Sequence, residues 1–181
     1  FGVGISRVDA SSVATVEAAL RPETRMVFVE AIANPRTQIP DLEAIGRLCR
    51  ERGVLFVVDN TVPSPVLFRP KAVGAGLVMN SLSKTLGGHG AALGGVITDT
   101  GEFDWSAHPN IATPYLSLDP RQRGLTQIRK KGLRDMGASL SSEQAHRISL
   151  GPETVELRSA RVSATALTLA RHLEAHPAIQ A

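Results

Sequence analysis

The residues of this sequence best suited to chemistry are a lysine and two serines that follow an apolar segment. Ser81, Ser83 and Lys84 come soon after the apolar residues 76–79, and a glycine-rich turn at residues 87–90 follows them. A lysine amine near the buried end of a strand can lose its proton at neutral pH, because desolvation disfavours the charged form. A neutral amine is a nucleophile that forms Schiff bases with aldehydes. The segment therefore predicts a covalent lysine site, past which the glycines let the backbone turn without side-chain clashes.

An aspartate at the end of a second apolar segment indicates which aldehyde this site would take. Asp59 closes residues 54–59, VLFVVD. Pyridoxal 5'-phosphate supplies an aldehyde for a lysine, and it needs a carboxylate beside its ring nitrogen to act as an electron sink. Its phosphate needs hydrogen-bond donors, which Ser81 and Ser83 can supply. Together these residues predict a pyridoxal-phosphate site with Lys84 as the attachment point.

Each of these residues also has a purely structural explanation. An aspartate after a strand is often a turn former, and a lysine in a glycine-rich loop is usually a solvated charge. A nucleotide-binding loop fits poorly, because its lysine follows the glycines whereas Lys84 precedes them. The alternative from a different functional class is a non-covalent phosphate-binding module that uses the glycine loop without covalent chemistry. The spacing of Asp59 and Lys84 favours the cofactor site.

The elements that must position these residues alternate between strand and helix. We predict a helix that begins at Asp41 and ends at Gly53, with Cys49 on its apolar stripe. Short runs rich in Val, Ile and Leu predict buried strands, the first of them buried on both faces. The four predicted strands are residues 26–32, 54–59, 76–81 and 94–99. The pattern indicates an α/β fold with a mostly parallel sheet and flanking helices.

Three polar side chains follow successive predicted strands. Asn34 comes after the first strand, Asp59 ends the second, and Lys84 comes after the third. Ligands of open parallel sheets bind beyond the carboxyl ends of the strands, where the loops gather. We therefore expect these side chains to converge at one edge of the sheet.

The pattern changes after residue 100. Residues 101–120 are typical of a loop, which Trp105 would pack onto the domain, and residues 121–137 are basic and interrupted by glycines. Residues 152–177 predict one long helix between two prolines, because apolar residues recur along one face.

The composition is that of a globular protein. The 181 residues are 43% apolar and 20% charged, with a net charge of +3, which gives only a weak preference for anionic ligands. The one cysteine, Cys49, forms no internal disulfide and fits a reducing compartment such as the cytoplasm. No apolar run is long enough to span a membrane, and the histidines lack metal-ligand spacing. We therefore expect neither a membrane nor a metal as a partner. The basic residues of 121–134 lack interleaved aromatics, so we expect no nucleic-acid partner either.

Over nearly its whole length the sequence resembles the Cys/Met metabolism family of pyridoxal-phosphate enzymes. This family contains cystathionine γ-synthase, O-acetylhomoserine sulfhydrylase, methionine γ-lyase and the cystathionine lyases. The segments that carry the resemblance are "VFVEAIANP" (27–35), "LFVVDNTVPSPVLFRP" (55–70), "VMNSLSKTLGGHGAALGGVITD" (78–99) and "LRDMGASLSSEQAHRISLGPETVELR" (133–158). The chain departs from the family pattern at Val62, where an aromatic residue is common, and at Ser83, where threonine is common.

The resemblance implies roles for six residues. Lys84 would hold the cofactor and, once displaced by substrate, move protons between the α and β carbons. The other implied contacts are Asp59 with the pyridine nitrogen, Ser81 and Ser83 with the phosphate, Asn34 near the ring hydroxyl, and Thr61 near the ring or the lysine.

The resemblance also implies a type I pyridoxal-phosphate transferase fold that is truncated at both ends. Residues 1–130 would be the second half of the large cofactor domain, and residues 131–181 the start of a small C-terminal domain. The family's phosphate loop, stacking tyrosine and carboxylate-binding arginine cannot be placed in the chain, so we expect no turnover from this piece alone. The full-length protein is expected to be a homo-oligomer, a dimer or a tetramer.

The implied reaction is γ-replacement on an O-acylated homoserine with a thiol or sulfide. The alternative within the family is a C–S lyase, such as methionine γ-lyase or a cystathionine lyase. The choice of γ-replacement rests on the segments "GGHG" and "GGVITDTGEFDW", which are most similar to the sulfhydrylase and γ-synthase branch.

Overall fold

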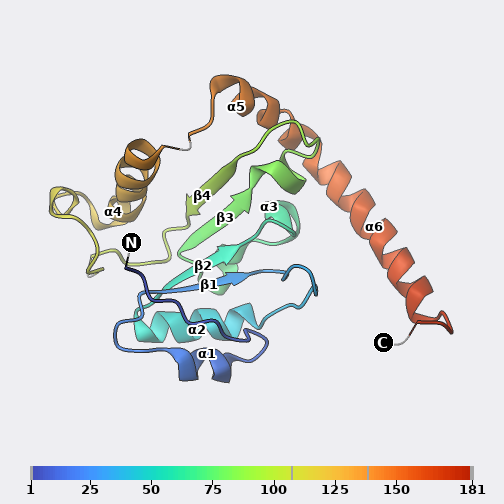
Figure 1. Ribbon diagram of the computed structural model, residues 1–181, viewed down its shortest axis with the longest axis horizontal. Helices are drawn as coiled ribbons and strands as arrows, with labels where there is room; N and C mark the ends of the chain where they lie inside the picture. Colours follow the sequence, from blue (N-terminus) through green and yellow to red (C-terminus); the bar gives the residue numbers. More distant parts are fainter. Residues whose placement is uncertain (1, 107, 138, 180–181) are drawn as a thin grey trace.

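The computed structural model describes residues 2–106, 108–137 and 139–179. A four-stranded sheet lies at its centre, with the strands in sequence order (Figure 1). The strands are β1 (Met26–Glu30), β2 (Leu55–Asp59), β3 (Leu77–Ser81) and β4 (Gly95–Asp99). The first three are parallel, and β4 runs antiparallel to β3. The predicted mostly parallel sheet is confirmed, and all four strands lie within their predicted ranges.

Two helices cover one face of the sheet. They are α1 (Val13–Ala19) and α2 (Leu42–Arg52), which lie together below β1 and β2 in Figure 1. Helix α2 has the predicted ends, since the Asp41 side chain accepts the Ala44 N–H at 2.9 Å and Gly53 takes a φ of 63°. The side chain of Cys49 is 1% exposed among the core residues of this face, and its burial raises the thiol pKa to about 12. Cys49 is therefore a core residue, as predicted.

An aromatic cover packs on the other face of the sheet. Trp105 is buried against Leu55 and Leu77, and its Nε1–H donates to Asp99 Oδ2 at 3.0 Å. A Cβ at Gly124 would lie 2.2 Å from the indole ring, so only glycine allows this approach. The expected role of Trp105 in packing the loop onto the domain is confirmed.

Gly124 belongs to a helix, α4 (Pro120–Gln127), which continues into a second helical segment at Ile128–Arg134. The sequence pattern predicted an interrupted segment here, and that prediction was wrong. The helix forms because Asp119 accepts the Arg121 N–H at its start and because its interior glycine packs on the indole.

The predictions that β1 is buried on both faces and that β4 is a buried strand were also wrong, since four of the five residues of β4 are exposed and the fifth is half-buried. Met26 is 52% exposed and Phe28 is 49% exposed, although Val29 on the opposite face is buried. The strand lies at an edge of the sheet, and the aromatic cover packs on Leu55 of β2 rather than on β1. An edge strand has a neighbouring strand on one side only, so its side chains are exposed where no other layer packs over them.

The C-terminal part of the chain forms α5 (Ser142–Ser149), a short 3₁₀ turn η5 (Gly151–Thr154) and the long helix α6 (Val155–Glu174). Helix α6 extends away from the sheet in Figure 1, and all its side chains from residue 160 onward are exposed. The predicted helix is present, but it begins three residues after Pro152. The proline lies in η5, which packs against the backbone that follows Lys84.

Candidate functional site

The predicted site residues lie at the carboxyl ends of the parallel strands. Asp59 is the last residue of β2 and Ser81 the last residue of β3. Lys84 lies in the helical turn η2 (Leu82–Leu86), which follows β3 directly. Because β2 and β3 are parallel, these ends meet at the same edge of the sheet. The expected convergence of the strand ends is therefore present in the fold.

A chain of hydrogen bonds joins the ends of β2 and β3. The Thr61 N–H donates to Asp59 Oδ1 at 2.9 Å, and Thr61 Oγ1 accepts the Ser81 N–H at 2.8 Å. Thr61 therefore holds the aspartate and the serine in a fixed relation. The implied place of its side chain near a bound ring stays a prediction.

Two buried asparagines strengthen this connection, and the sequence analysis did not identify them. Asn80 Nδ2 donates to Asn60 O at 2.8 Å, and Asn60 Nδ2 donates to Phe68 O at 2.8 Å. Both residues are at most 5% exposed. The signal was present in the sequence, because each asparagine stands beside a predicted site residue, in "DNT" and "MNS".

The backbone around Lys84 forms an unusual turn. Lys84 itself has non-helical angles, φ −104° and ψ −130°, inside an otherwise helical segment. The Gly87 N–H donates to Leu82 O at 3.1 Å, and the Gly88 N–H donates to Lys84 O at 2.8 Å. Gly88 has a φ of 72°, a value that favours glycine. We call residues 82–88 the lysine turn. They present the Lys84 side chain to solvent, so the burial that the sequence analysis expected for this amine is not found in the described chain.

The two serines have different surroundings. Ser83 Oγ accepts the Gly94 N–H at 3.0 Å and lies 3.4 Å from Gly94 O, so it ties the lysine turn to the start of β4. The Ser81 hydroxyl forms no hydrogen bond within the part of the chain that the structure describes. The Ser81 hydroxyl is therefore available to donate to an incoming anion.

Asn34 lies in the loop after β1. Its backbone N–H donates to Glu30 Oε2 at 2.8 Å, and its side chain is exposed. Glu30 pairs with Asp59 across the parallel strands, so the Asn34 loop leaves the same edge of the sheet. The implied contact of Asn34 with a ring hydroxyl stays a prediction.

The groups gathered at this edge have the chemistry that pyridoxal phosphate requires. They are an exposed amine on Lys84, a carboxylate on Asp59 whose Oδ2 has no partner in the described ranges, and a hydroxyl on Ser81. An amine, a carboxylate for the ring nitrogen and a phosphate donor form the donor set of such a site. A metal would need a different set, and no cluster of three His, Cys, Asp or Glu side chains occurs among residues 2–106, 108–137 and 139–179.

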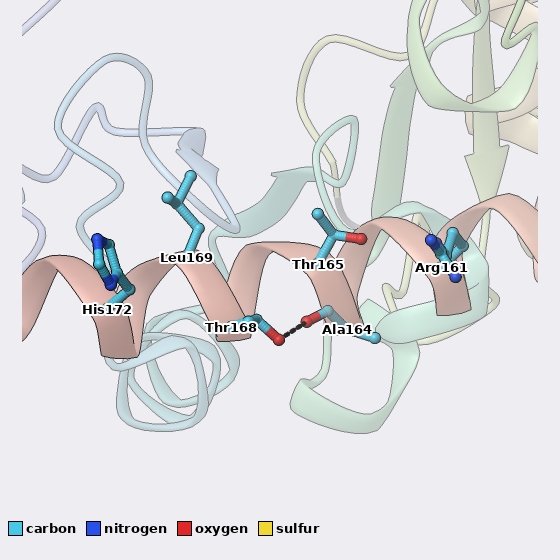
Figure 2. A pocket seen from close by; sticks show the side chains of 6 residues that line it. All are labelled: Arg161, Ala164, Thr165, Thr168, Leu169 and His172. Carbon is cyan, nitrogen blue, oxygen red and sulfur yellow. Dashed lines mark hydrogen bonds between the residues drawn. The ribbon is translucent and has the colours of Figure 1, made fainter.

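Two hollows in the described surface are lined by other residues than these groups. The first is lined only by side chains of α6, and Figure 2 shows several of them, including Thr165, Leu169 and His172, along this one helix. The second lies at the amino ends of the strands and is lined by residues that include Arg25 and His108. At the carboxyl edge the Lys84 side chain is exposed, whereas Asp59 and Ser81 are half-buried.

The fold and the site define the class of protein. A mostly parallel α/β sheet with a lysine and an aspartate at the carboxyl ends of neighbouring strands supplies the amine and the carboxylate that a pyridoxal-phosphate-dependent enzyme uses. No described helix is both long and apolar enough to cross a membrane.

The chain belongs to the Cys/Met metabolism PLP-dependent enzyme family, which it matches over residues 1–181. It is 35% identical over 202 residues to the O-acetyl-L-homoserine sulfhydrylase of Leptospira meyeri, covering 99% of this chain and 45% of that protein. It is 40% identical over 172 residues to O-acetyl-L-homoserine sulfhydrylase 1 of Thermus thermophilus, covering 87% and 40%. It is also 36% identical over 182 residues to the L-methionine gamma-lyase of Pseudomonas deceptionensis, covering 99% and 40%.

Solved structures support the same fold. A putative O-acetylhomoserine (thiol)-lyase from Campylobacter jejuni, which contains N'-pyridoxyl-lysine-5'-monophosphate, matches with a TM-score of 0.83 and 27% identity over 96% of this chain. The O-acetylhomoserine sulfhydrylase of Wolinella succinogenes matches with a TM-score of 0.82 and 31% identity, also over 96%. This chain covers 46% and 49% of those two structures, so it spans less than half the length of its relatives. The predicted family, fold class and cofactor are confirmed.

Proposed function

We propose that the chain carries the covalent cofactor site of an enzyme that performs γ-replacement on an O-acylated homoserine, with a thiol or sulfide as the second substrate. The observation that carries the proposal is that Asp59 ends β2 and the exposed Lys84 follows the parallel neighbour β3, in a chain that matches a pyridoxal-phosphate family throughout. The preference for O-acylhomoserine rests on the sulfhydrylases among its relatives.

The proposed roles follow from the atoms that are available. When bound, pyridoxal phosphate withdraws electrons from the carbons of an amino-acid substrate. Lys84 Nζ would hold the cofactor and afterwards carry a proton between the α and β carbons. Asp59 Oδ2 would accept a hydrogen bond from the protonated ring nitrogen, while Asp59 Oδ1 continues to accept the Thr61 N–H. Asn34 and Thr61 would lie near the ring.

The serines would share the phosphate unequally. Ser81 is the better donor, because its hydroxyl has no other partner among the described residues. Ser83 accepts one hydrogen bond from Gly94, and its own proton faces only the Gly94 carbonyl at 3.4 Å. A hydroxyl can accept and donate at the same time, so Ser83 can exchange that long contact for a phosphate oxygen.

The direct test of the site is covalent attachment at Lys84. The full-length protein is incubated with pyridoxal phosphate, reduced with borohydride and mapped by mass spectrometry. We expect the label on the peptide that contains Lys84, and its complete loss in Lys84→Ala. Lys71→Ala is the matched control, because Lys71 is exposed and pairs with Glu102 at 3.7 Å. A label on another lysine, or no label on the wild-type protein, refutes the proposal.

A second candidate function is elimination by a C–S lyase. It is favoured by the methionine gamma-lyase that is 36% identical over 99% of this chain. Assays of the full-length protein with O-acetylhomoserine plus sulfide, and separately with methionine or cystathionine alone, distinguish the two reactions. Release of ammonia and a keto acid without added thiol supports the lyase.

The proposal extends to the domain organisation, oligomeric state and compartment of the full-length protein. Residues 1–130 would belong to the large cofactor domain and residues 131–181 to the start of a smaller domain, in a cytoplasmic homo-oligomer with an amino-acid substrate. The exposed apolar side chains of β1 and α6 support a cover from further chain or further subunits, and the buried thiol of Cys49 suits a reducing compartment. The 181 residues alone would not turn over substrate.

A further inference from the structure

The last carbonyls of the lysine turn are bound by a residue far away in the sequence. The carbonyls that end a helical segment have no partner within it. Arg158 of α6 supplies one, because its Nη1 donates to Thr85 O at 2.8 Å and its Nη2 lies 3.4 Å from Leu86 O. These two carbonyls come immediately after Lys84, so Arg158 holds the backbone on which the lysine is carried.

The same guanidinium also binds the segment that leads into α6. Arg158 Nη2 donates to Gly151 O at 2.8 Å, and Nε donates to Thr154 Oγ1 at 3.0 Å. A guanidinium has five N–H donors in a rigid planar fork, so one side chain can bind two backbone segments at once. Arg158 therefore links the lysine turn to the C-terminal part of the chain.

The backbones that Arg158 links are in direct contact. A Cβ at Gly88 would lie 2.4 Å from Arg158 Cζ. A Cβ at Gly151 would lie 2.3 Å from both Leu86 O and Gly87 O. Neither position can accept a side chain without moving the lysine turn or the guanidinium. The close contact shows that the two glycines make room for this linkage.

Carbonyl groups, rather than a carboxylate, surround the positive charge. In the described ranges Arg158 forms no ion pair with an Asp or Glu. A cation near the carboxyl end of a helical segment is stabilised by the partial negative charge of its unpaired carbonyls. The arrangement thus depends on the orientation of the lysine turn, and it is lost if the turn changes conformation.

We propose that Arg158 is a positioning residue that fixes the lysine turn, so that Lys84 faces the carboxyl edge of the sheet. The proposal rests on the proposed function only in giving Lys84 the cofactor; the bracing of the turn stands on its own contacts. Through Arg158, any displacement of the start of α6 reaches the lysine backbone directly.

The first test measures the turn itself in the cofactor-free full-length protein. Hydrogen–deuterium exchange is followed at the amides of Gly87 and Gly88, which are bonded to Leu82 O and Lys84 O. In Arg158→Gln we expect exchange at least about tenfold faster at these amides, because hydrogen bonds from a charged donor are lost. Arg158→Lys restores only part of the protection, since an ammonium cannot reproduce the fork.

Two further variants keep this test interpretable. Arg161→Gln is the matched control, because Arg161 lies on the same helix, is exposed and has no hydrogen-bond partner in the part of the chain described; exchange is expected to stay at the wild-type rate. Thr154→Val removes the acceptor of Nε and the 3.4 Å contact of Thr154 Oγ1 with Gly151 O, but leaves the bonds from Arg158 to the lysine turn, so it should give a smaller change in the same direction even if Arg158→Gln folds poorly. Wild-type exchange at Gly87 and Gly88 in both Arg158→Gln and Thr154→Val overturns the proposal.

The second test measures the consequence for the lysine. The rate of borohydride-trapped attachment at Lys84 should fall about tenfold in Arg158→Gln, and kcat should fall with it while KM for the amino-acid substrate changes little, because the hydrogen bonds that Arg158 forms with the described residues all go to the turn and η5. An unchanged attachment rate and kcat overturn the proposal. If the wild-type protein shows no attachment at Lys84 but Arg158→Gln still speeds exchange, the proposed function fails and the positioning of the turn stands.

Discussion

Two aspartates of the sheet each end a strand, one at the carboxyl ends of the parallel strands and the other at their amino ends. They differ in whether the second carboxylate oxygen accepts a hydrogen bond. Asp59 ends β2, whereas Asp99 ends β4, which runs antiparallel to β3. In both, Oδ1 accepts the backbone N–H two residues later, at 2.9 Å. Oδ2 of Asp99 also accepts the Trp105 Nε1–H at 3.0 Å, but Oδ2 of Asp59 has no partner among the residues described.

The comparison shows what separates a structural aspartate from a candidate functional one. The local turn is the same, because an aspartate readily accepts the N–H two residues on. At Asp99 an aromatic side chain covers the second oxygen and completes its hydrogen bonding. At Asp59 the second oxygen stays available for a ligand. The difference lies in one side-chain contact, because Trp105, six residues after Asp99, donates to its second oxygen, whereas no described residue donates to that of Asp59.

Removing the aromatic partner of Asp99 should have the largest effect. In Trp105→Ala we expect a loss of about 3–5 kcal/mol in the free energy of unfolding of the full-length protein, because a buried indole leaves a cavity. Trp105→Phe keeps most of the ring and loses mainly the hydrogen bond to Asp99, so its loss should be about 1–3 kcal/mol. Chemical denaturation measures both. Wild-type denaturation midpoints in both variants contradict the structural role given to this end of the sheet.

Exchanging carboxylate for amide at each aspartate sharpens the comparison. Asp59→Asn keeps the bond to the Thr61 N–H, so stability should hold, but kcat/KM should fall by about a hundredfold or more, since the charge at the ring nitrogen is lost. Asp99→Asn should leave kcat unchanged and lower the free energy of unfolding by about 1 kcal/mol, because an amide fits the Trp105 donor poorly. Steady-state kinetics and denaturation of the same preparations measure the pair, and a reversed pattern contradicts it.

The smallest expected effect is a pH dependence at the Trp105 end of the sheet. His108 contacts the Trp105 ring with centroids 5.5 Å apart, and burial, with a smaller contribution from Arg25, holds its pKa below the usual 6.5. Protonation of His108 therefore opposes folding. The contribution of the neutral imidazole to the free energy of unfolding is complete above pH 6.5 and decreases as the pH falls toward the lowered pKa of His108. Thermal melts between pH 7 and pH 5 should show a smaller drop in His108→Gln than in the wild type. Equal drops would exclude His108 as the group responsible.

The sequence was a good guide wherever short-range patterns decide the structure. The apolar runs predicted all four strands, and Asp41 and Gly53 predicted both ends of α2. The strand-end positions of Asp59 and Lys84 followed from the same runs. Each of these features depends on residues within a few positions of one another, so local propensity and capping suffice.

The errors share a different origin. Residues 121–137 looked interrupted because of their glycines, but Gly124 is where the helix meets Trp105. Strand β1 looked buried on both faces, but the cover of the sheet does not extend over Met26. In both cases the packing of a distant segment decided the outcome, through contact at Gly124 and through its absence at Met26, and no pattern within the segment itself reports such packing.

The amino-acid sequence by itself determined the strands, the family and the groups suited to hold a cofactor, because these depend on residue type and local spacing. The tertiary structure decided which oxygen of Asp59 stays open and how Asn60 and Asn80 join the strand ends. It also decided that Arg158 binds the lysine turn at Thr85 O, 73 positions earlier in the chain. Hydrogen bonds are short and directional, so their partners are set by where folding brings each backbone and not by order along the chain.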